Sequence, residues 1–391
     1  MIKIVLKKGE DRRLRDGHPW VFSNEIKEIT GGATPGAAAE LFDAGGSFLG
    51  TGYYNPRSLI AVRLLSRRRE DIDCTEFFSH RLRRALEYRE SIYPGEDNYR
   101  VAYGEADFLS GLVVDKYGDY LSLQILSAGM EVRRDFIIAA LTELFHPKGI
   151  VARNDVGVRT LEGLEEKVEI LYGSIPGSVE VTEHGIRLLV DLMGGQKTGH
   201  FLDQRSNHLL LSGYCAGKDV LDLFCYSGSW ALHAAYYGAK SALGIDISDK
   251  AVALAERQAD LNGLGNVAKF EAVDAFARLR SLRDEGRRFG VVVLDPPAFV
   301  KSKKMLNEAL KGYATVNRRA MELLEDGGYL VTCSCSYHLG REQFREILVS
   351  AARQAGRTMR LVATGFPSPD HPVLLAAPET DYLKCHLLQA V

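Results

Sequence analysis

The stretch DVLDLFCYSGSW, residues 219–230, decides the fold of this chain. A short apolar run that ends in a Gly/Ser turn and opens into a helical pattern is typical of a parallel strand followed by a crossover helix. Four similar runs follow it along the chain: ALGIDI, AKFEAV, GVVVLD and GYLVTCS. This alternation predicts a mostly parallel sheet with helices on both faces, in which ligands bind beyond the carboxyl ends of the strands.

The rest of the chain divides into two further predicted domains. Residues 1–73 hold short apolar runs broken by glycines and prolines, which predicts a small β-barrel. Residues 74–185 begin with a helical pattern, continue with strands, a second helix and more strands, and so predict a central α+β domain. Residues 186–391 carry the parallel sheet. The fold class is therefore α/β, with two smaller domains that precede the parallel sheet in the sequence.

Composition excludes several classes of protein. With 46% hydrophobic and 26% charged residues among 391, the chain is neither disordered nor collagen-like. No apolar run reaches the roughly 18 residues of a membrane helix. The first residues lack the apolar core of a signal peptide, so we expect a cytoplasmic protein without a membrane partner. The six cysteines are scattered and form no CxxC, and no cluster of histidines has ligand spacing, which predicts no metal.

Charge has to be considered locally, because 49 Lys and Arg against 51 Asp and Glu leave a net charge of only −2. Basic residues nevertheless cluster, and each cluster is compatible either with a solvated face or with contacts to nucleic-acid phosphates. The clusters comprise Lys7, Lys8, Arg12, Arg13 and Arg15; Arg67, Arg68 and Arg69; Arg81, Arg83 and Arg84; and Lys301, Lys303 and Lys304.

Acidic residues stand at three successive strand ends and indicate a nucleoside site. Asp222 lies at the end of the first strand, Asp246 ends the second, where a carboxylate can accept hydrogen bonds from ribose hydroxyls, and Asp274 follows the third, placed to meet an adenine amino group. We assign cofactor contacts to these acids, to nearby residues, namely Phe224, Tyr226, Gly228, Ile247 and Ala275, and to Asp295 at the end of the fourth strand.

The missing motifs decide which nucleoside cofactor is expected. The loop after the first strand contains only Gly228, so the GxGxxG fingerprint of dinucleotide binding is absent. GGQKTGH, residues 194–200, lacks the glycine before its lysine that a P-loop requires. S-adenosylmethionine (SAM) has an adenosine but no phosphate, so it fits a nucleoside site that lacks a phosphate-binding motif.

The fourth and fifth strands end in residues suited to chemistry. LDPPAF, residues 294–299, places Asp295 before two prolines that stiffen the loop, and an aromatic residue there can stack on a planar base. The fifth strand ends in TCSCS, residues 332–336, so Cys333 or Cys335 lies at the cleft. A SAM enzyme that methylates carbon 5 of cytosine must first add a nucleophile at carbon 6, and a thiolate can do this. We assign the attack to Cys335, with Cys333 as the alternative, and the stabilisation of the ring at N3 to Asp295.

At these residues the chain resembles class I methyltransferases, and in particular the bacterial 23S ribosomal RNA large subunit methyltransferase I family of cytosine-5 enzymes. GHPWVFSNEI, GEADFLSGLVVDKYGDYL, GGQKTGHFLDQR, DLFCYSGSW, DPPAF and CSCS carry the resemblance, which covers essentially the whole chain. It implies an amino-terminal PUA domain that binds RNA, a central domain, a Rossmann-like catalytic domain and ribosomal RNA as partner. It also implies that Phe201, Gln204 and Arg205 border the cofactor.

Two departures from this pattern leave alternatives open. The tandem Cys333-Ser334-Cys335 permits two alignments, since Thr332-Cys333-Ser334 resembles the motif of one group and Ser334-Cys335-Ser336 resembles that of the uracil-5 enzymes. Many RNA cytosine-5 methyltransferases carry a second cysteine directly after the proline of the fourth-strand loop, whereas Ala298 follows Pro297 here, so the base that removes the carbon 5 proton is unassigned. Methylation of guanine or of an exocyclic amino group is the second enzyme hypothesis, and an RNA-binding assembly factor without turnover is the third. The sequence is compatible with both a homodimer and a monomer.

Overall fold

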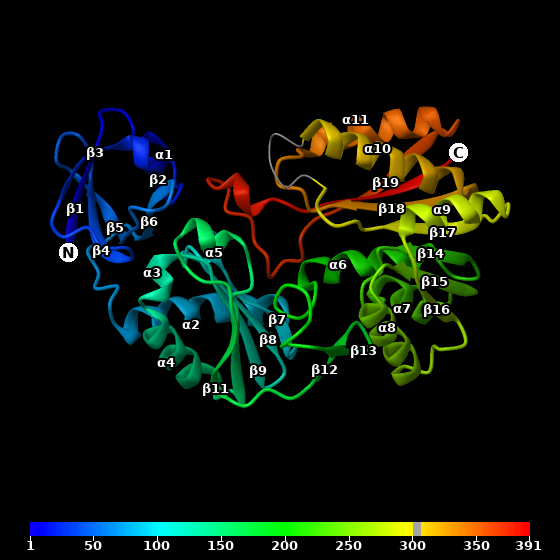
Figure 1. The fold of residues 1–391 in the computed structure, drawn as a ribbon, viewed down its shortest axis with the longest axis horizontal. Coiled ribbons are helices and arrows are strands. Elements are labelled where there is room, and N and C mark those ends of the chain that lie inside the picture. The colour runs from blue at the N-terminus through cyan, green and yellow to red at the C-terminus, as the bar shows by residue number, and fades with distance from the viewer. Residues whose placement is uncertain (300–305) are drawn as a thin grey trace. The chain divides into compact units, whose positions relative to one another are not determined.

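The computed structural model describes residues 1–299 and 306–391 (Figure 1). Lys301, Lys303 and Lys304 of the fourth basic cluster lie outside the described residues. The chain forms two compact units. The first contains Met1–Val181, Val190–Leu202 and Pro369–Thr380, and the second contains Thr182–Leu189, Asp203–Ser368 and Asp381–Val391.

The first unit begins with a six-stranded β-domain. Its strands are β1 (Ile2–Leu6), β2 (Trp20–Phe22), β3 (Ile26–Thr30), β4 (Ala37–Phe42), β5 (Phe48–Tyr54) and β6 (Ile60–Ser66), in the order β2-β6-β5-β4-β1-β3. The short helix α1 (Arg12–Arg15) and the 3-10 turn η1 (Ser23–Glu25) connect them. Alternate residues of β1 are buried, and they pack into an apolar core with Leu41 and Val62.

A five-stranded sheet forms the second part of this unit, in the order β11-β10-β9-β8-β7. Its strands are β7 (Asn98–Tyr103), β8 (Leu112–Tyr117), β9 (Tyr120–Ile125), β10 (Gly149–Arg153) and β11 (Val168–Gly173). The long helices are α2 (Thr75–Ile92) and α4 (Arg134–Phe145), and the short ones are η2 (Gly104–Asp107), α3 (Ala128–Glu131) and α5 (Val158–Leu161). Buried residues of both long helices, such as Phe78 and Ile137, share one core with the sheet. The strand pair β12 (Val179–Glu183) and β13 (Ile186–Val190) leads into the second unit.

The second unit is built on a seven-stranded sheet in the order β16-β15-β14-β17-β18-β20-β19. The parallel strands are β14 (Asp219–Leu223), β15 (Ser241–Asp246), β16 (Ala268–Ala272), β17 (Phe289–Leu294) and β18 (Leu324–Ser334). β20 (Lys384–Ala390) is antiparallel to β18 and to β19 (Met359–Gly365). The predicted α/β fold is confirmed, and the antiparallel strand pair at the edge is an addition that the five apolar runs did not predict.

Helices cover both faces of this sheet (Figure 1). On one face, α9 (Ala275–Asp284), α10 (Leu306–Glu322) and α11 (Arg341–Gln354) share a core through Leu279, Val316 and Phe344. α7 (Ser229–Tyr236) and α8 (Asp249–Leu261) lie on the other face. The remaining short helices are η3 (Leu202–Gln204), α6 (Arg205–His208), η4 (Leu209–Gly213) and η6 (Pro378–Thr380).

The strand order creates a topological switch point. From β14 the chain first builds β15 and β16 on one side and then returns to place β17 on the other side of β14. Leu223 at the end of β14 is paired with Leu294 at the end of β17. Ligands of open α/β sheets bind in the crevice at such a point, so the fold directs attention to the loops that follow β14 and β17.

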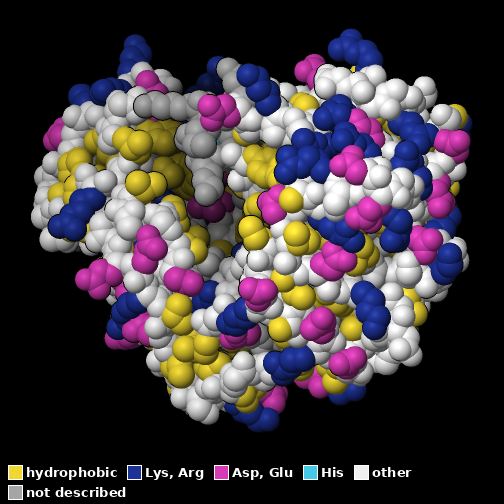
Figure 2. All heavy atoms as spheres, turned by 45° about the vertical axis from the view of Figure 1, so that its right-hand side comes forward, with side chains coloured by type: hydrophobic (Ala, Val, Ile, Leu, Met, Phe, Trp, Pro, Cys, Tyr) yellow, Lys and Arg dark blue, Asp and Glu magenta, His cyan; other side chains and the backbone are white. Residues whose placement is uncertain are grey.

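Figure 2 shows one face of the molecule, with Lys and Arg side chains dispersed among acidic ones and gathered more densely in its upper part. Both charge signs are therefore mixed on this face, in keeping with the small net charge of −2. Among the described residues, no helix is long and apolar enough to cross a bilayer.

Candidate active site

The loop between β14 and α7 has an unusual backbone. Phe224 and Tyr226 have φ values of 64° and 48°, in the left-handed region that bulky residues rarely adopt. Gly228 has a φ of 83°, and a Cβ there would lie 2.7 Å from the ring of Phe270 and 2.9 Å from Ala255. Only glycine allows this loop to lie so close to its neighbours. Strained backbone of this kind is concentrated at functional sites.

Asp222 is fully buried at the carboxyl end of β14. Its Oδ2 accepts a hydrogen bond from the backbone N–H of Ala231 at 3.0 Å, whereas its Oδ1 has no partner among the described residues. Burial raises the pKa of Asp222 well above its ordinary value, and the nearby charges of Asp295 and Asp246 raise it further. The carboxylates of Asp222, Asp246 and Asp295 repel one another, and Asp222 Oδ1 has no hydrogen-bond donor among the described residues. This arrangement favours a ligand that carries a positive charge and a hydrogen-bond donor.

Asp246 is held rigidly at the end of β15. Its Oδ2 accepts the backbone N–H of Tyr226 and its Oδ1 accepts that of Ser248, both at 2.9 Å. Each carboxylate oxygen has a second lone pair, so Asp246 can still accept hydrogen bonds from two hydroxyl groups. Ile247 follows with 74% of its surface exposed, which provides an apolar side chain next to that carboxylate.

Asp274 has a structural role at the third strand end. Its Oδ1 accepts the N–H of Ala277 at 2.8 Å and thereby caps helix α9, whose first residue Ala275 is buried. Phe276 then packs against Phe224 with ring centroids 6.2 Å apart. The cap fixes the Asp274 carboxylate near the loop that follows β14. It uses Oδ1, so the carboxylate can cap α9 and still make the predicted contact with adenine.

These residues fit a SAM molecule. SAM carries two positively charged groups, the sulfonium and the amino group, next to its adenosine, and the unpaired Oδ1 of Asp222 offers an acceptor among three carboxylates. Asp246 would hold the ribose hydroxyls, and Ile247 and Asp274 would border the adenine. When bound, SAM supplies an electrophilic methyl group.

Asp295 follows β17 and accepts two hydrogen bonds on the same oxygen. Gln204 Nε2 donates to its Oδ2 at 2.9 Å, and Trp230 Nε1 donates to it at 3.2 Å. Gln204 is itself oriented, because its Oε1 accepts from Asn207 Nδ2 at 2.6 Å. No motif in the sequence indicates the role of Trp230, since a tryptophan at the first turn of a helix is equally suited to packing.

The other two residues that the resemblance implies at the cofactor lie in different units. Arg205 is buried in the second unit, where its backbone oxygen lies 3.1 Å from His184 Nε2. Phe201 belongs to the first unit, and the Lys197 ammonium lies 4.3 Å from the centroid of its ring. Their contact with the cofactor stays a prediction.

Trp230 is supported by a buried histidine cluster. The ring of His208 meets Trp230 edge-on at 4.6 Å and stacks on His233 at 4.7 Å, and His208 Nδ1 lies 2.6 Å from Glu183 Oε1. Tetrahedral ligands with bonds of about 2.0–2.1 Å lie roughly 3.3 Å apart. A separation of 2.6 Å is therefore that of a hydrogen-bonded pair, and we interpret the cluster as a support for Trp230.

The cluster predicts a loss of stability in acid. Burial lowers the pKa of His233 to about 3. In the unfolded chain His233 binds a proton as the pH falls below about 6.5, whereas in the folded chain it stays neutral until a much lower pH. We expect His233 to remove about 1.4 kcal/mol of unfolding free energy per pH unit below roughly pH 6.5. Urea unfolding followed by Trp230 fluorescence in a Trp20→Phe background measures this slope for the second unit. His233→Asn does not titrate, and an unchanged slope in that variant contradicts the assignment.

The two candidate nucleophiles have different surroundings. Cys333 is fully buried within β18, directly opposite Cys385 of β20. Burial raises the pKa of Cys333 well above its ordinary value, and the neighbouring Cys385 thiol raises it further. Cys335 lies one residue beyond the end of β18 and is partly exposed. A reactive thiolate needs an accessible and electropositive setting, which favours Cys335.

A buried lysine lies next to Cys335. Lys384 has 2% of its surface exposed, and its Nζ donates to the backbone oxygens of Ser336 and Tyr382, each at 2.7 Å. Burial lowers the pKa of Lys384 to about 8, while the charge of Cys335 raises it. The phenol of Tyr313 completes the surroundings through its hydrogen bond to Ser336 Oγ at 2.9 Å. Lys384 comes from β20, which lies between β18 and β19 and which the apolar runs of the sequence did not predict, so no motif indicated it.

Comparison with known proteins identifies the family. A PUA-like domain model matches residues 4–67, and a model of S-adenosylmethionine-dependent methyltransferases matches residues 163–377. Ribosomal RNA large subunit methyltransferase I of Klebsiella pneumoniae is 39% identical over 386 residues, which cover 98% of this chain and 96% of the relative. The Vibrio cholerae protein of that name is 40% identical over 388 residues, with 97% of each chain covered. The chain belongs to this family.

Solved structures agree with the family at the level of the fold. A SAM-dependent methyltransferase from Streptococcus mutans superposes with a TM-score of 0.85, at 22% identity and with 100% of both chains covered. A second structure, of the methyltransferase SMU.776 in complex with SAH, has a TM-score of 0.86 at 22% identity and the same coverage. The predicted family, the PUA-like and Rossmann-like domains and the SAM cofactor are therefore confirmed.

Proposed function

We propose that this large subunit methyltransferase transfers the methyl group of SAM to carbon 5 of a cytosine in ribosomal RNA, with Cys335 as the nucleophile. The supporting observation is a partly exposed cysteine at a strand end, next to the buried ammonium of Lys384. β17 and β18 are parallel neighbours in which Leu294 is paired with Thr332. Asp295 and Cys335 thus follow adjacent strand ends at the same edge of the sheet.

The proposed reaction has three steps. The Cys335 thiolate forms a bond to carbon 6, and the electrons of the carbon 5–carbon 6 double bond move to carbon 5. Carbon 5 then forms a bond to the methyl carbon; the bond between that carbon and the sulfonium sulfur would break, its electron pair would stay on the sulfur, and the demethylated cofactor would leave as a neutral thioether. A base, which we leave unassigned, removes the carbon 5 proton, and those electrons restore the double bond as the bond between sulfur and carbon 6 breaks. The enzyme recovers its thiolate, and the base carries away one proton.

Asp295 is proposed to act at the N3 edge of the cytosine ring. Attack at carbon 6 places negative charge on the ring, and a carboxyl group at N3 stabilises that charge by supplying a proton or a hydrogen bond. Gln204 and Trp230 both donate to Oδ2 of Asp295, and they hold the carboxyl group in one orientation. Preorganisation of this kind is what an electrostatic contribution to catalysis requires.

Lys384 is proposed to stabilise the Cys335 thiolate. The charged groups around Lys384 are Cys335, Arg341 and Asp381. Asp381 is already bound by Arg341, whose Nε and Nη2 lie 3.2 and 2.5 Å from its two oxygens. The Cys335 sulfur is therefore the anion that best compensates the buried Lys384 ammonium.

Removing the Lys384 charge should slow the reaction of Cys335 with an alkylating agent. We expect Lys384→Met to reduce the rate of iodoacetamide labelling of Cys335 at neutral pH about 10-fold, and to shift the pH profile upward by about one unit, because a nearby cation favours the thiolate. Lys384→Arg should restore most of the rate. Mass spectrometry of the peptide containing Cys335 measures labelling without any RNA. Identical profiles for wild type and Lys384→Met contradict this role.

Methyl transfer from labelled SAM to ribosomal RNA without its natural modifications tests the proposed function itself. The expected product is 5-methylcytosine, identified by mass spectrometry of the digested RNA. A methylated guanine or a methylated exocyclic amino group contradicts the cytosine-5 assignment but leaves the family and the cofactor unaffected.

A further inference from the structure

A pocket in the first unit brings together two basic clusters that are separate in the sequence. It has a volume of about 330 Å³, within the range of small-ligand sites. Arg67 and Arg68, which follow β6, and Arg81 and Arg84 of α2 contribute to its lining, and Glu70 is the one acidic residue there. The loop after α1 and the exposed ring of Phe108 complete the wall.

The arginines of this pocket lack a full set of counter-charges. Arg81 donates to the backbone oxygen of Leu65 at 3.0 Å and lies 3.4 Å from Glu70. Burial lowers the pKa of Arg81, and the neighbouring charges of Arg84 and Arg68 lower it further. Over residues 1–299 and 306–391, no carboxylate forms a salt bridge with Arg68 or Arg84. The neighbouring positive charges of Arg68, Arg81 and Arg84 repel one another, and an anion bound between them would remove this destabilisation of the fold.

Phe108 adds a flat apolar surface to this cationic pocket. The residue is 48% exposed and has a φ of 58°, a left-handed conformation that is uncommon for an aromatic residue. Its ring centroid lies 6.0 Å from the Arg81 guanidinium carbon. An exposed aromatic ring beside arginines is the combination with which proteins bind single-stranded RNA, by stacking on a base and pairing with its phosphate.

We propose that this pocket binds one nucleotide of single-stranded RNA, with the phosphate between the arginines that follow β6 and those of α2, and with the base stacked on Phe108. The site rests on the proposed RNA substrate and adds a contact outside the candidate active site. An unstacked nucleotide fits better than a duplex, because the bases of a duplex are not available to Phe108.

Binding of a fluorescein-labelled single-stranded oligouridylate to the full chain, followed by anisotropy over a salt series, tests this proposal. We expect the double variant Arg81→Ala/Arg84→Ala to bind about 10-fold more weakly. Its logarithmic salt slope should be shallower by about 0.7, the value for the one phosphate that the variant no longer neutralises. Phe108→Ala should weaken binding about 5-fold with an unchanged slope, because stacking involves no counterion release.

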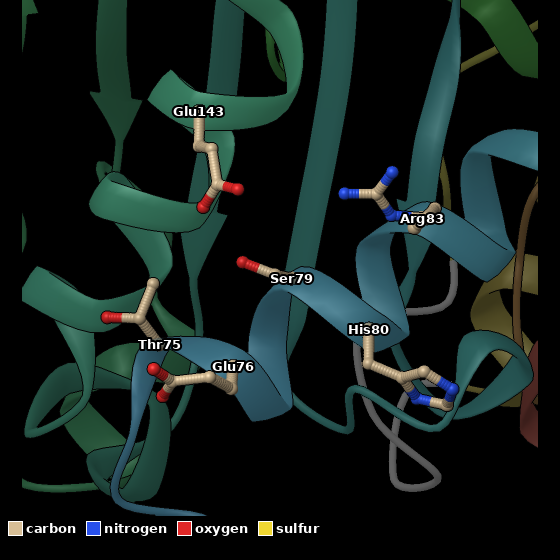
Figure 3. A pocket seen from close by; sticks show the side chains of 6 residues that line it. All are labelled: Thr75, Glu76, Ser79, His80, Arg83 and Glu143. Atoms are coloured by element: carbon tan, nitrogen blue, oxygen red, sulfur yellow. The ribbon is translucent and has the colours of Figure 1, made fainter.

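Arg83 provides a matched control on the same helix. It lines a different hollow, together with Thr75, Glu76, Ser79, His80 and Glu143, in which acidic and basic groups are mixed (Figure 3). Arg83→Ala removes one positive charge from α2, against two in the double variant, without touching the arginine pocket, and its affinity should stay within about 2-fold of wild type.

Three outcomes would overturn the proposal. Equal losses of oligouridylate affinity in Arg83→Ala and in the double variant would show that any positive charge on α2 has the same effect. An unchanged affinity in the double variant would exclude the site, and so would the absence of oligouridylate binding by the wild type. Arg84→Glu, at an exposed position, replaces the double variant if that one fails to fold. The assay needs no SAM and no turnover, so its failure and a failure of the cytosine-5 assignment are separate results.

Discussion

Replacement of Cys335 by alanine should abolish methyl transfer to ribosomal RNA. Without the thiolate, carbon 5 of cytosine has no means of becoming nucleophilic, and removal of the nucleophile from a covalent mechanism costs on the order of 10⁴-fold or more in rate. The side chain is partly exposed and lies just beyond β18, so its truncation should leave the core of the second unit intact. Transfer of label from SAM to unmodified ribosomal RNA measures the loss.

Cys333→Ala is the matched control for this prediction. The Cys333 thiol is buried against Cys385, and burial raises its pKa, so it should contribute packing rather than attack. We expect this variant to retain activity within about 10-fold and to lose about 1 kcal/mol of stability, as for a small core truncation. If Cys333→Ala is inactive and Cys335→Ala is active, the two cysteines exchange roles. If both variants are active, the covalent mechanism is wrong.

Replacement of Asp295 by asparagine should lower the rate of methyl transfer by about 10²–10⁴-fold, the usual contribution of a positioned acid–base group. The structure explains why the amide is a poor substitute. Gln204 and Trp230 both donate to Oδ2, so they select the amide oxygen for that position and direct the amide nitrogen toward the other side. An amide nitrogen can donate a hydrogen bond to N3 but cannot transfer a proton.

Single-turnover rates at saturating SAM measure this effect, with SAM affinity determined separately by calorimetry. Asp219→Asn makes the same chemical change at the opposite end of β14, where Asp219 accepts from Ser241 Oγ at 2.7 Å, and it should leave the rate unaltered. A normal single-turnover rate in Asp295→Asn together with weaker SAM binding would assign Asp295 to the cofactor alone. Iodoacetamide labelling of Cys335 should proceed normally in this variant, because the thiolate does not depend on N3.

Much of this protein follows from local patterns in its sequence. The alternation of apolar runs and helical segments predicts the parallel sheet, because a strand buried on both faces must be apolar along its length. The carboxyl ends of parallel strands meet at one edge, so the sequence by itself predicts that Asp222, Asp246 and Asp295 lie at the same edge of the sheet. The absence of phosphate-binding motifs directed the choice toward SAM, which the family confirms.

Contacts between residues far apart in the chain were decided by the tertiary structure alone. β20 is inserted antiparallel between β18 and β19 and brings Lys384 to Cys335 from 49 positions along the chain, 384 − 335. Trp230 reaches Asp295 only because β14 and β17 are neighbours. The arginines after β6 and on α2 form one pocket because two elements of the first unit fold against each other. Periodicity and motif spacing determine what each segment becomes, whereas burial, charge and hydrogen-bond partners depend on which segments meet.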